Sequence, residues 1–183
     1  MQTLETVTDI SFPFDWVNLT SFRESDAKRV EIYLADSDKP VAGLIIMFTT
    51  LFSGIEHDIL VYSKSWWGFC LDTWDIHADI YNYDLENKSI ETQGYLAMLC
   101  EAEIPGNYEG VCKVKNWEMF LSTILPCITN QIAPYSPIFF SKHHNIFFYF
   151  HHTGSIGLYY RDEGNEMNKL LKIAEAKYDV IYN

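Results

Sequence analysis

Three aromatic-rich runs near the C-terminus constrain the fold more than any other part of the chain. They cover residues 137–140, 145–151 and 155–160, and the segments between them are short enough for hairpin turns. Aromatic and β-branched side chains favour strands, and a hairpin joins neighbouring strands in antiparallel order. The region therefore predicts an antiparallel sheet, with Gly154 supplying the positive φ of the second turn.

Two amphipathic helices are predicted in the C-terminal half. In residues 116–131 the apolar side chains recur at spacings of three and four, which places them on one stripe: Trp117, Phe120, Leu121, Ile124 and Ile128. Pro126 lies inside this pattern and predicts a kink or an early end of the helix. Residues 166–178 form the second helix, with these side chains on one face: Met167, Leu170, Leu171, Ala174 and Tyr178.

Most of the remaining chain is predicted to be strand. The predicted strands are residues 30–35, 41–49, 57–63, 74–84, 109–114 and 179–182. The first three could form an antiparallel meander with a turn at 36–40, and the second is apolar on both faces, as in a central strand. Residues 89–103 fit a strand or a helix, and the turn before them favours a strand. Residues 1–29 are predicted to be irregular or to contain a short helix.

Strands outnumber helices in this pattern and occur in runs, which predicts an α+β fold. The expected architecture is a largely antiparallel sheet with two amphipathic helices in the C-terminal half. A chain of 183 residues suits one hydrophobic core, so we expect a single domain spanning residues 1–183.

The charge balance narrows the classes of partner. The chain has 13 Lys and Arg against 25 Asp and Glu, a formal net charge of −12. This excess disfavours direct binding to nucleic acid and docking on an anionic membrane, because both surfaces are negative. The sequence begins without a secretory leader pattern, and its longest apolar run, residues 41–48, is too short to span a bilayer. The four cysteines lack CxxC spacing, which favours reduced, mostly buried thiols. We therefore expect a cytoplasmic protein.

The sequence contains no recognisable catalytic motif. It has no G-x-S-x-G elbow, no phosphate-binding loop and no G-x-G-x-x-G fingerprint. We therefore predict no catalytic residues, no metal and no cofactor, and a protein that is not an enzyme.

One alternative is a metal-dependent hydrolase built on Asp75, His77 and Asp79. These side chains would share one face of the predicted strand at about 7 Å between alternate residues, where they could ligate a metal or exchange protons. A histidine of the C-terminal hairpins would have to join them. The solvent-exposed face of a half-buried strand explains the same three residues without any chemistry.

Two histidine doublets, His143–His144 and His151–His152, flank the same predicted strand. Neighbouring residues of a strand point to opposite faces, and the doublets lie roughly 26 Å apart along it. Zinc needs all its ligands within about 2.3 Å of one point, so a structural or solvent-exposed role is predicted for both doublets.

The acidic side chains are concentrated in one segment. Residues 65–112 hold nine acidic residues and one basic residue, Lys88, and so carry −8 of the net charge of −12. The same segment is rich in Trp and Tyr. Charges steer a partner from a distance, and Tyr and Trp anchor it on contact. We predict that this segment forms one face and binds a partner through Asp72, Asp75, Asp79, Tyr81, Tyr83, Asp84, Glu86 and Glu91. Solubility alone is the competing explanation of the charge.

A small, acidic, aromatic-rich α+β chain of this kind resembles the immunity proteins of bacterial polymorphic-toxin and contact-dependent growth-inhibition systems. The acidic block at residues 71–76 and the aromatic stretch at residues 147–160 carry the resemblance, which is one of overall character. It implies that the chain binds a cognate toxin, a basic nuclease, and blocks its active site. A nucleic-acid mimic that inhibits another DNA- or RNA-binding protein would also bind a basic partner through an acidic surface, and the sequence leaves that alternative open.

Overall fold

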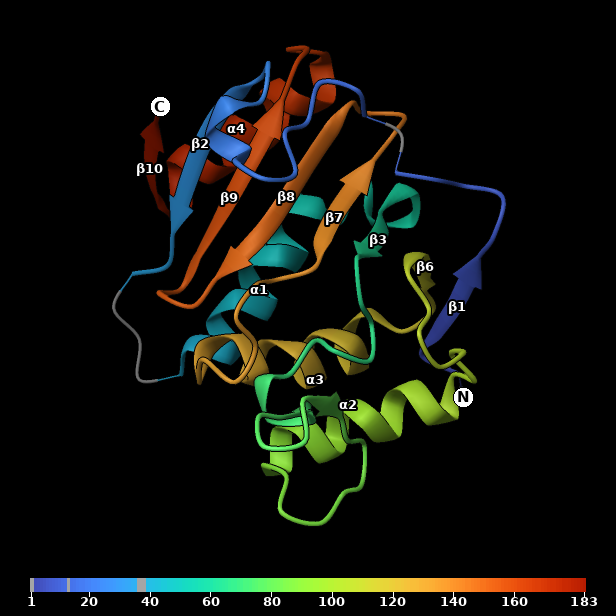
Figure 1. Ribbon diagram of the computed structural model, residues 1–183. Coiled ribbons are helices and arrows are strands. Elements are labelled where there is room, and N and C mark those ends of the chain that lie inside the picture. Colours follow the sequence, from blue (N-terminus) through green and yellow to red (C-terminus); the bar gives the residue numbers. More distant parts are fainter. Residues whose placement is uncertain (1, 13, 36–38) are drawn as a thin grey trace.

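An eight-stranded sheet forms the centre of the structure. The structure is a computed structural model and describes residues 2–12, 14–35 and 39–183. Every neighbouring pair of strands is antiparallel, in the order β1-β6-β3-β7-β8-β9-β2-β10 (Figure 1). The α+β class with a largely antiparallel sheet is thus confirmed. In chain order the strands are β1 (Leu4–Val7), β2 (Lys28–Tyr33), β3 (Leu60–Ser63), β6 (Gly110–Val114), β7 (Ile138–Ser141), β8 (Ile146–His151), β9 (Ser155–Tyr160) and β10 (Asp179–Tyr182).

The C-terminal hairpins form as the sequence predicts. Strands β7, β8 and β9 pair in succession, with Phe139 opposite Phe148 and Phe148 opposite Leu158. Gly154 adopts the expected positive φ, at 85°, in the second turn. In the first turn Asn145 takes the left-handed conformation, with a φ of 54°, which Asn tolerates better than most residues.

Both helices predicted in the C-terminal half are also present. They are α3 (Trp117–Thr129) and α4 (Asn165–Lys177). Helix α3 continues for three residues past Pro126, so the early end predicted there does not occur. Helices α1 and α3 cover one face of the sheet, and α4 lies behind β9 and β2 (Figure 1). Their apolar side chains bury Phe139, Phe148 and Phe150 of the sheet in the main core.

Residues 41–49 form a helix, and the predicted central strand is wrong. Helix α1 (Pro40–Phe52) begins with Pro40 in its first turn, where a missing N–H costs nothing. Its buried side chains recur at helical spacing and continue beyond the predicted strand: Leu44, Met47, Phe48, Leu51 and Phe52. The predicted meander is wrong for the same reason: β2 pairs with β9 and β10, and β3 pairs with β6 and β7. Residues 36–38 of the predicted turn lie outside the described residues.

Residues 89–103 are also helical, where a strand was favoured. In α2 (Ile90–Glu101) the Ser89 hydroxyl accepts a hydrogen bond from the backbone N–H of Thr92, which caps the helix. Helix α2 packs against α3, and Tyr95, Leu96 and Leu99 are buried on its inner face. The hydroxyl of Tyr95 donates a hydrogen bond of 2.7 Å to the carbonyl of Trp66.

The opposite face of the sheet is covered by side chains of the N-terminal segment, from Phe12 and from residues 14–27. Phe14 and Trp16 from this segment pack on Phe140 and Phe147, forming a second, smaller core. The strands β7 and β8 are therefore buried on both faces, which explains why their aromatic residues do not alternate with polar ones. Strand β1, within a region predicted to be irregular, pairs with β6 at the sheet edge.

Candidate functional site

Most of the acidic segment, residues 71–101, lies at one end of the molecule, whereas residues 110–112 belong to β6 in the main sheet. Residues 71–101 form the short helix η3 (Leu71–Thr73), a two-stranded hairpin of β4 (Trp74–Asp75) and β5 (Ile80–Tyr81), a loop over residues 82–89, and α2. These elements lie together beyond α3, away from β10 and α4 (Figure 1). We call residues 71–91 the acidic hairpin surface.

The hairpin replaces the single strand predicted over residues 74–84. The carboxylate of Asp75 accepts hydrogen bonds from the backbone N–H groups of His77 and Ala78, at 2.9 and 3.0 Å, and so stabilises a turn. Asp79 closes this turn with a φ of 57°. Asp75 and Asp79, at the two ends of this turn, are the sequence signal for a hairpin. The period-2 alternation of the same residues is equally compatible with a single strand.

Large apolar side chains are exposed across this surface. Seven of the thirteen exposed large hydrophobic residues among the described residues lie within it: Leu71, Trp74, Ile76, Ile80, Tyr81, Leu85 and Ile90. In a single strand over residues 74–84, period-2 alternation would place Trp74, Ile76 and Ile80 on the face opposite Asp75, His77 and Asp79. Instead Ile76 is 79% exposed and Ile80 is 58% exposed, because the hairpin stands apart from the main sheet.

A row of aromatic rings supports the hairpin. Trp74 contacts Tyr81 edge-on with ring centroids 4.8 Å apart, Tyr81 stacks on Tyr83 at 6.0 Å, and Tyr83 contacts Trp67 at 5.1 Å. The indole N–H of Trp67 donates to the carbonyl of Pro105 at 2.9 Å. The exposed rings of Trp74 and Tyr81 therefore pack in a continuous row that ends at Trp67, whose indole is hydrogen-bonded to the backbone.

The predicted binding residues divide into two groups. Asp79, Asp84 and Glu86 are exposed, as is Tyr81, whereas Tyr83 is half-buried. Burial, followed by the nearby Tyr81, raises the pKa of Tyr83. The carboxylates of Asp72, Asp75 and Glu91 instead make hydrogen bonds within the chain. Glu91 accepts a bond of 2.9 Å from the side-chain amide of Asn130.

Asp72 has a structural role that the sequence analysis missed. Its carboxylate accepts hydrogen bonds from the Thr92 hydroxyl at 2.6 Å and from the Ser89 backbone N–H at 2.9 Å, at the start of α2. Burial raises the pKa of Asp72, but the hydrogen bonds from Thr92 and Ser89 outweigh burial and lower it overall. Lys88, the one basic residue of the segment, donates to the Asp72 carbonyl at 2.6 Å.

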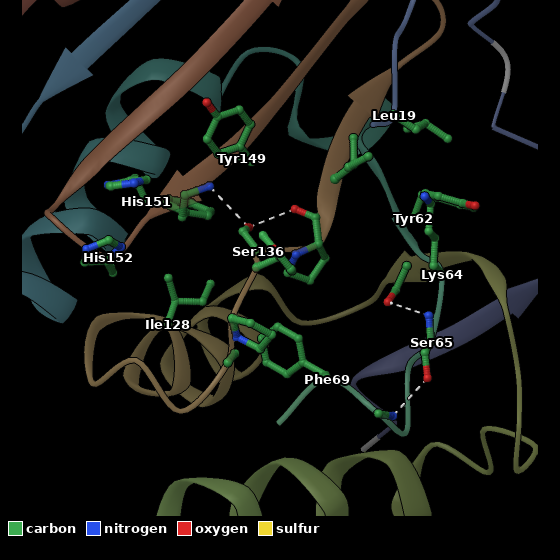
Figure 2. Close-up of a pocket in the computed structure, with 18 of the residues that line it drawn as sticks. Leu19, Tyr62, Lys64, Ser65, Phe69, Ile128, Ser136, Tyr149, His151 and His152 are labelled. Atoms are coloured by element: carbon green, nitrogen blue, oxygen red, sulfur yellow. Dashed lines mark hydrogen bonds between the residues drawn. The ribbon is translucent and has the colours of Figure 1, made fainter. Parts of the chain in front are cut away.

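A pocket of about 880 Å³ adjoins the hairpin on the sheet face that carries the N-terminal segment. Tyr62, Tyr149 and Phe69 contribute aromatic walls, and Lys64, His151 and His152 also line it (Figure 2). Gly68 connects the two features, since a Cβ built on it would lie 2.9 Å from the Tyr81 hydroxyl. A partner on the hairpin could therefore insert an apolar or aromatic side chain into the pocket.

The structure does not bring the residues of the hydrolase alternative together. Among the described residues, one group of three acidic, His or Cys side chains has its ligand atoms within 4.8 Å of one another. Asp75, His77 and Asp79 are not members of that group. His77 and Asp79 are exposed on the hairpin turn. In the second doublet, His151 shares a hydrogen bond of 2.7 Å with the Thr153 hydroxyl.

The comparisons with known proteins assign no family. No family model matches the chain, and neither a curated protein nor a solved structure matches it. None of the helices in the described residues combines the length and hydrophobicity that crossing a bilayer requires.

Proposed function

We propose that this chain is a cytoplasmic inhibitor of the immunity-protein type. It binds a basic protein through the acidic hairpin surface and blocks that protein's active site without catalysing a reaction. The partner we propose is a nuclease toxin, because an enzyme that binds nucleic acid presents a positively charged cleft, which is complementary to an acidic surface.

The observation that carries this proposal is the coincidence of exposed apolar side chains with acidic ones. Monomeric proteins rarely leave large apolar side chains clustered in water, and such clusters rimmed by charge are typical of binding surfaces. Charge alone would be explained by solubility. Solubility does not explain Ile76, Ile80 and Ile90, each more than half exposed among the acids.

The arrangement supports two separate roles within the acidic hairpin surface, electrostatic steering and contact with the partner. The exposed carboxylates of Asp79, Asp84 and Glu86 create a negative potential that accelerates the approach of a cationic partner. Trp74 and Tyr81, fixed by the aromatic row, then contribute contact area with little loss of side-chain entropy. Steering governs the association rate, and anchoring governs the dissociation rate.

The test compares the wild type with two charge-reversed variants of equal charge. The hairpin variant is Asp84→Lys with Glu86→Lys, and the control is Asp9→Lys with Asp15→Lys, both exposed and outside the surface. Each protein is used to capture partners from the source cell. The captured protein is then purified, assayed for cleavage of RNA and DNA, and used to measure association rates at 50 and 200 mM salt.

We expect the wild type and the control to capture a basic protein and to abolish its nuclease activity at equal molar amounts. The hairpin variant should associate at least tenfold more slowly at low salt and show a weaker salt dependence. Tyr81→Ala should mainly raise the dissociation rate. Equal association rates for the hairpin variant and the control, or a captured nuclease that stays active when bound to the wild type, would refute the proposal. A basic partner without toxin activity would favour the nucleic-acid mimic.

A further inference from the structure

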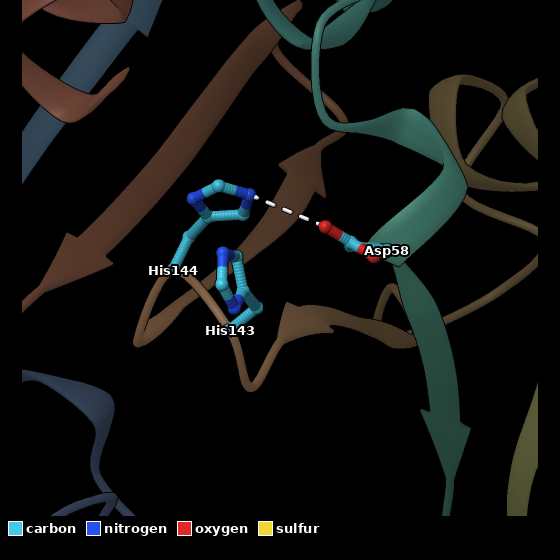
Figure 3. Close-up of side chains that lie close together, drawn as sticks. All are labelled: Asp58, His143 and His144. Carbon is cyan, nitrogen blue, oxygen red and sulfur yellow. Dashed lines mark ion pairs between the residues drawn. The ribbon is translucent and has the colours of Figure 1, made fainter. Parts of the chain in front are cut away.

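Two turns on neighbouring strands place a carboxylate beside two imidazoles. His143 and His144 lie in the β7–β8 turn, and Asp58 ends the short helix η2 (Glu56–Asp58) just before β3 (Figure 3). Strand β3 pairs directly with β7, so the two turns meet at one end of the sheet. This group is unrelated to the acidic hairpin surface.

The separation between Asp58 and His144 matches a pair of metal ligands better than a hydrogen bond. One ligand atom from each of Asp58, His143 and His144 lies within 4.8 Å of the other two. The Nε2 atom of His144 is 3.4 Å from Oδ2 of Asp58, beyond the roughly 2.7–3.2 Å usual for an N–H···O bond. Two ligands at about 2.0–2.1 Å from a tetrahedral zinc ion are about 3.3–3.4 Å apart. The Asp58 and His144 atoms therefore already stand at a spacing that one ion could bridge, and the ligand atom of His143 lies within 4.8 Å of both.

The turn that carries both histidines is fixed by its surroundings. The backbone N–H of His144 donates to the hydroxyl of buried Ser141 at 3.3 Å. The side chain of Asn145 accepts a bond from the Trp16 indole at 3.1 Å and donates to Asp162 at 2.9 Å. These contacts hold the backbone of the turn, so ligand binding by the imidazoles costs little additional backbone entropy.

We propose that Asp58, His143 and His144 bind a divalent transition-metal cation of the zinc type. Imidazole nitrogen with one carboxylate suits Zn²⁺, whereas Mg²⁺ and Ca²⁺ prefer all-oxygen sites. The Nε2 atom of His57 also lies 3.5 Å from the same Asp58 oxygen, but His57 is outside the group of three whose ligand atoms are all within 4.8 Å of one another. The ion would cross-link the β7–β8 turn to the start of β3. The doublet was predicted to split across the sheet, but its residues lie in a turn, where the alternation of a strand does not apply.

The test is calorimetric titration of tag-free protein with ZnCl₂ and, separately, with MgCl₂. We expect one Zn²⁺ per chain and no binding of Mg²⁺. The variant His143→Ala with His144→Ala should bind Zn²⁺ at least tenfold more weakly, and Asp58→Asn should also weaken it. The matched control is the other doublet, His151→Ala with His152→Ala, which should bind as the wild type does.

A second measurement does not depend on any variant folding. In NMR spectra of the wild type, Zn²⁺ should shift the ring signals of His143 and His144 and leave those of His151 and His152 unchanged. Absence of Zn²⁺ binding, unchanged affinity in the His143/His144 variant, or an equal loss in the control would each overturn the proposal.

Discussion

Replacing Asp72 with Asn tests whether this carboxylate stabilises the fold. Asn keeps the size of Asp but loses the charge and one acceptor oxygen. In the wild type the two carboxylate oxygens accept from the Ser89 N–H and the Thr92 hydroxyl. In Asp72→Asn one of these donors faces an amide nitrogen, and the other loses a charged acceptor.

The expected loss follows from these two contacts. A hydrogen bond to a charged group contributes roughly 1.5–3 kcal/mol net. Because Asp72 is half-buried and solvent screens it, we take the lower end, about 1.5 kcal/mol at pH 7. With a urea dependence of about 2 kcal/mol per molar, the unfolding midpoint should fall by about 0.7 M.

The loss should also depend on pH. The folded-state pKa of Asp72 is lowered, so its stabilising contribution is present above its unfolded-state pKa of about 3.9. That contribution disappears as the pH falls through the folded-state pKa, because the protonated acid then resembles Asn. The difference between wild type and Asp72→Asn should therefore be full at pH 7 and narrow steadily below about pH 4.

The assay is urea unfolding followed by tryptophan fluorescence and circular dichroism at several pH values between 7 and 3. Asp79→Asn is the control, since Asp79 is exposed and Asn tolerates its positive φ. The control should change stability by less than about 0.5 kcal/mol. A loss in Asp72→Asn as small as that of the control, or one independent of pH, would show that Asp72 does not hold α2 in the way described.

Two glycine substitutions give further predictions, both measured by urea unfolding. Gly94→Ala should stabilise the protein by about 0.5–1 kcal/mol, because Gly94 is an exposed interior residue of α2 with open space where a Cβ would lie; a lower stability would contradict this reasoning. Gly157→Ala should destabilise by about 1–3 kcal/mol, because the added Cβ would lie 2.7 Å from the Tyr149 ring. In a Tyr149→Ala background that cost should largely vanish, and its persistence would point to backbone strain instead.

The parts of the fold that could be predicted are those whose partners are close in sequence. The β7–β8 and β8–β9 hairpins need only short turns, and Gly154 takes the conformation that its turn requires. Helix α3 shows a stripe at helical spacing over several turns. In these regions local preference and burial favour the same structure, so a pattern in the sequence is sufficient.

Two helices were not predicted, for different reasons. In the first, an apolar run has no polar face to show its period. Residues 41–48 carry no polar side chain, and the helical positions Leu51 and Phe52 lie beyond the predicted strand. In residues 89–103 the Ser89 cap and the spacing of Tyr95, Leu96 and Leu99 indicate a helix. The turn before this segment is compatible with a strand, but the Ser89 cap specifies a helix.

The site was predicted in part. Contiguity in sequence predicts that the acids lie near one another, and the elements formed by residues 71–91 do lie together at one end of the molecule (Figure 1). Sequence could not distinguish exposed carboxylates such as Asp84 from Asp72, which caps a helix from another element. It also placed Ile76 and Ile80 on a shared strand face, since alternation does not show that the hairpin stands apart from the main sheet.

The sequence by itself determined the antiparallel C-terminal hairpins, the amphipathic helices and the position of the negative charge, because each depends on neighbours along the chain. Tertiary structure alone decided which apolar residues remain in water and which distant side chains meet. Asp58 and His143 come together only because β3 pairs with β7. Such pairing depends on the packing of the whole sheet, and no local pattern of residues specifies it.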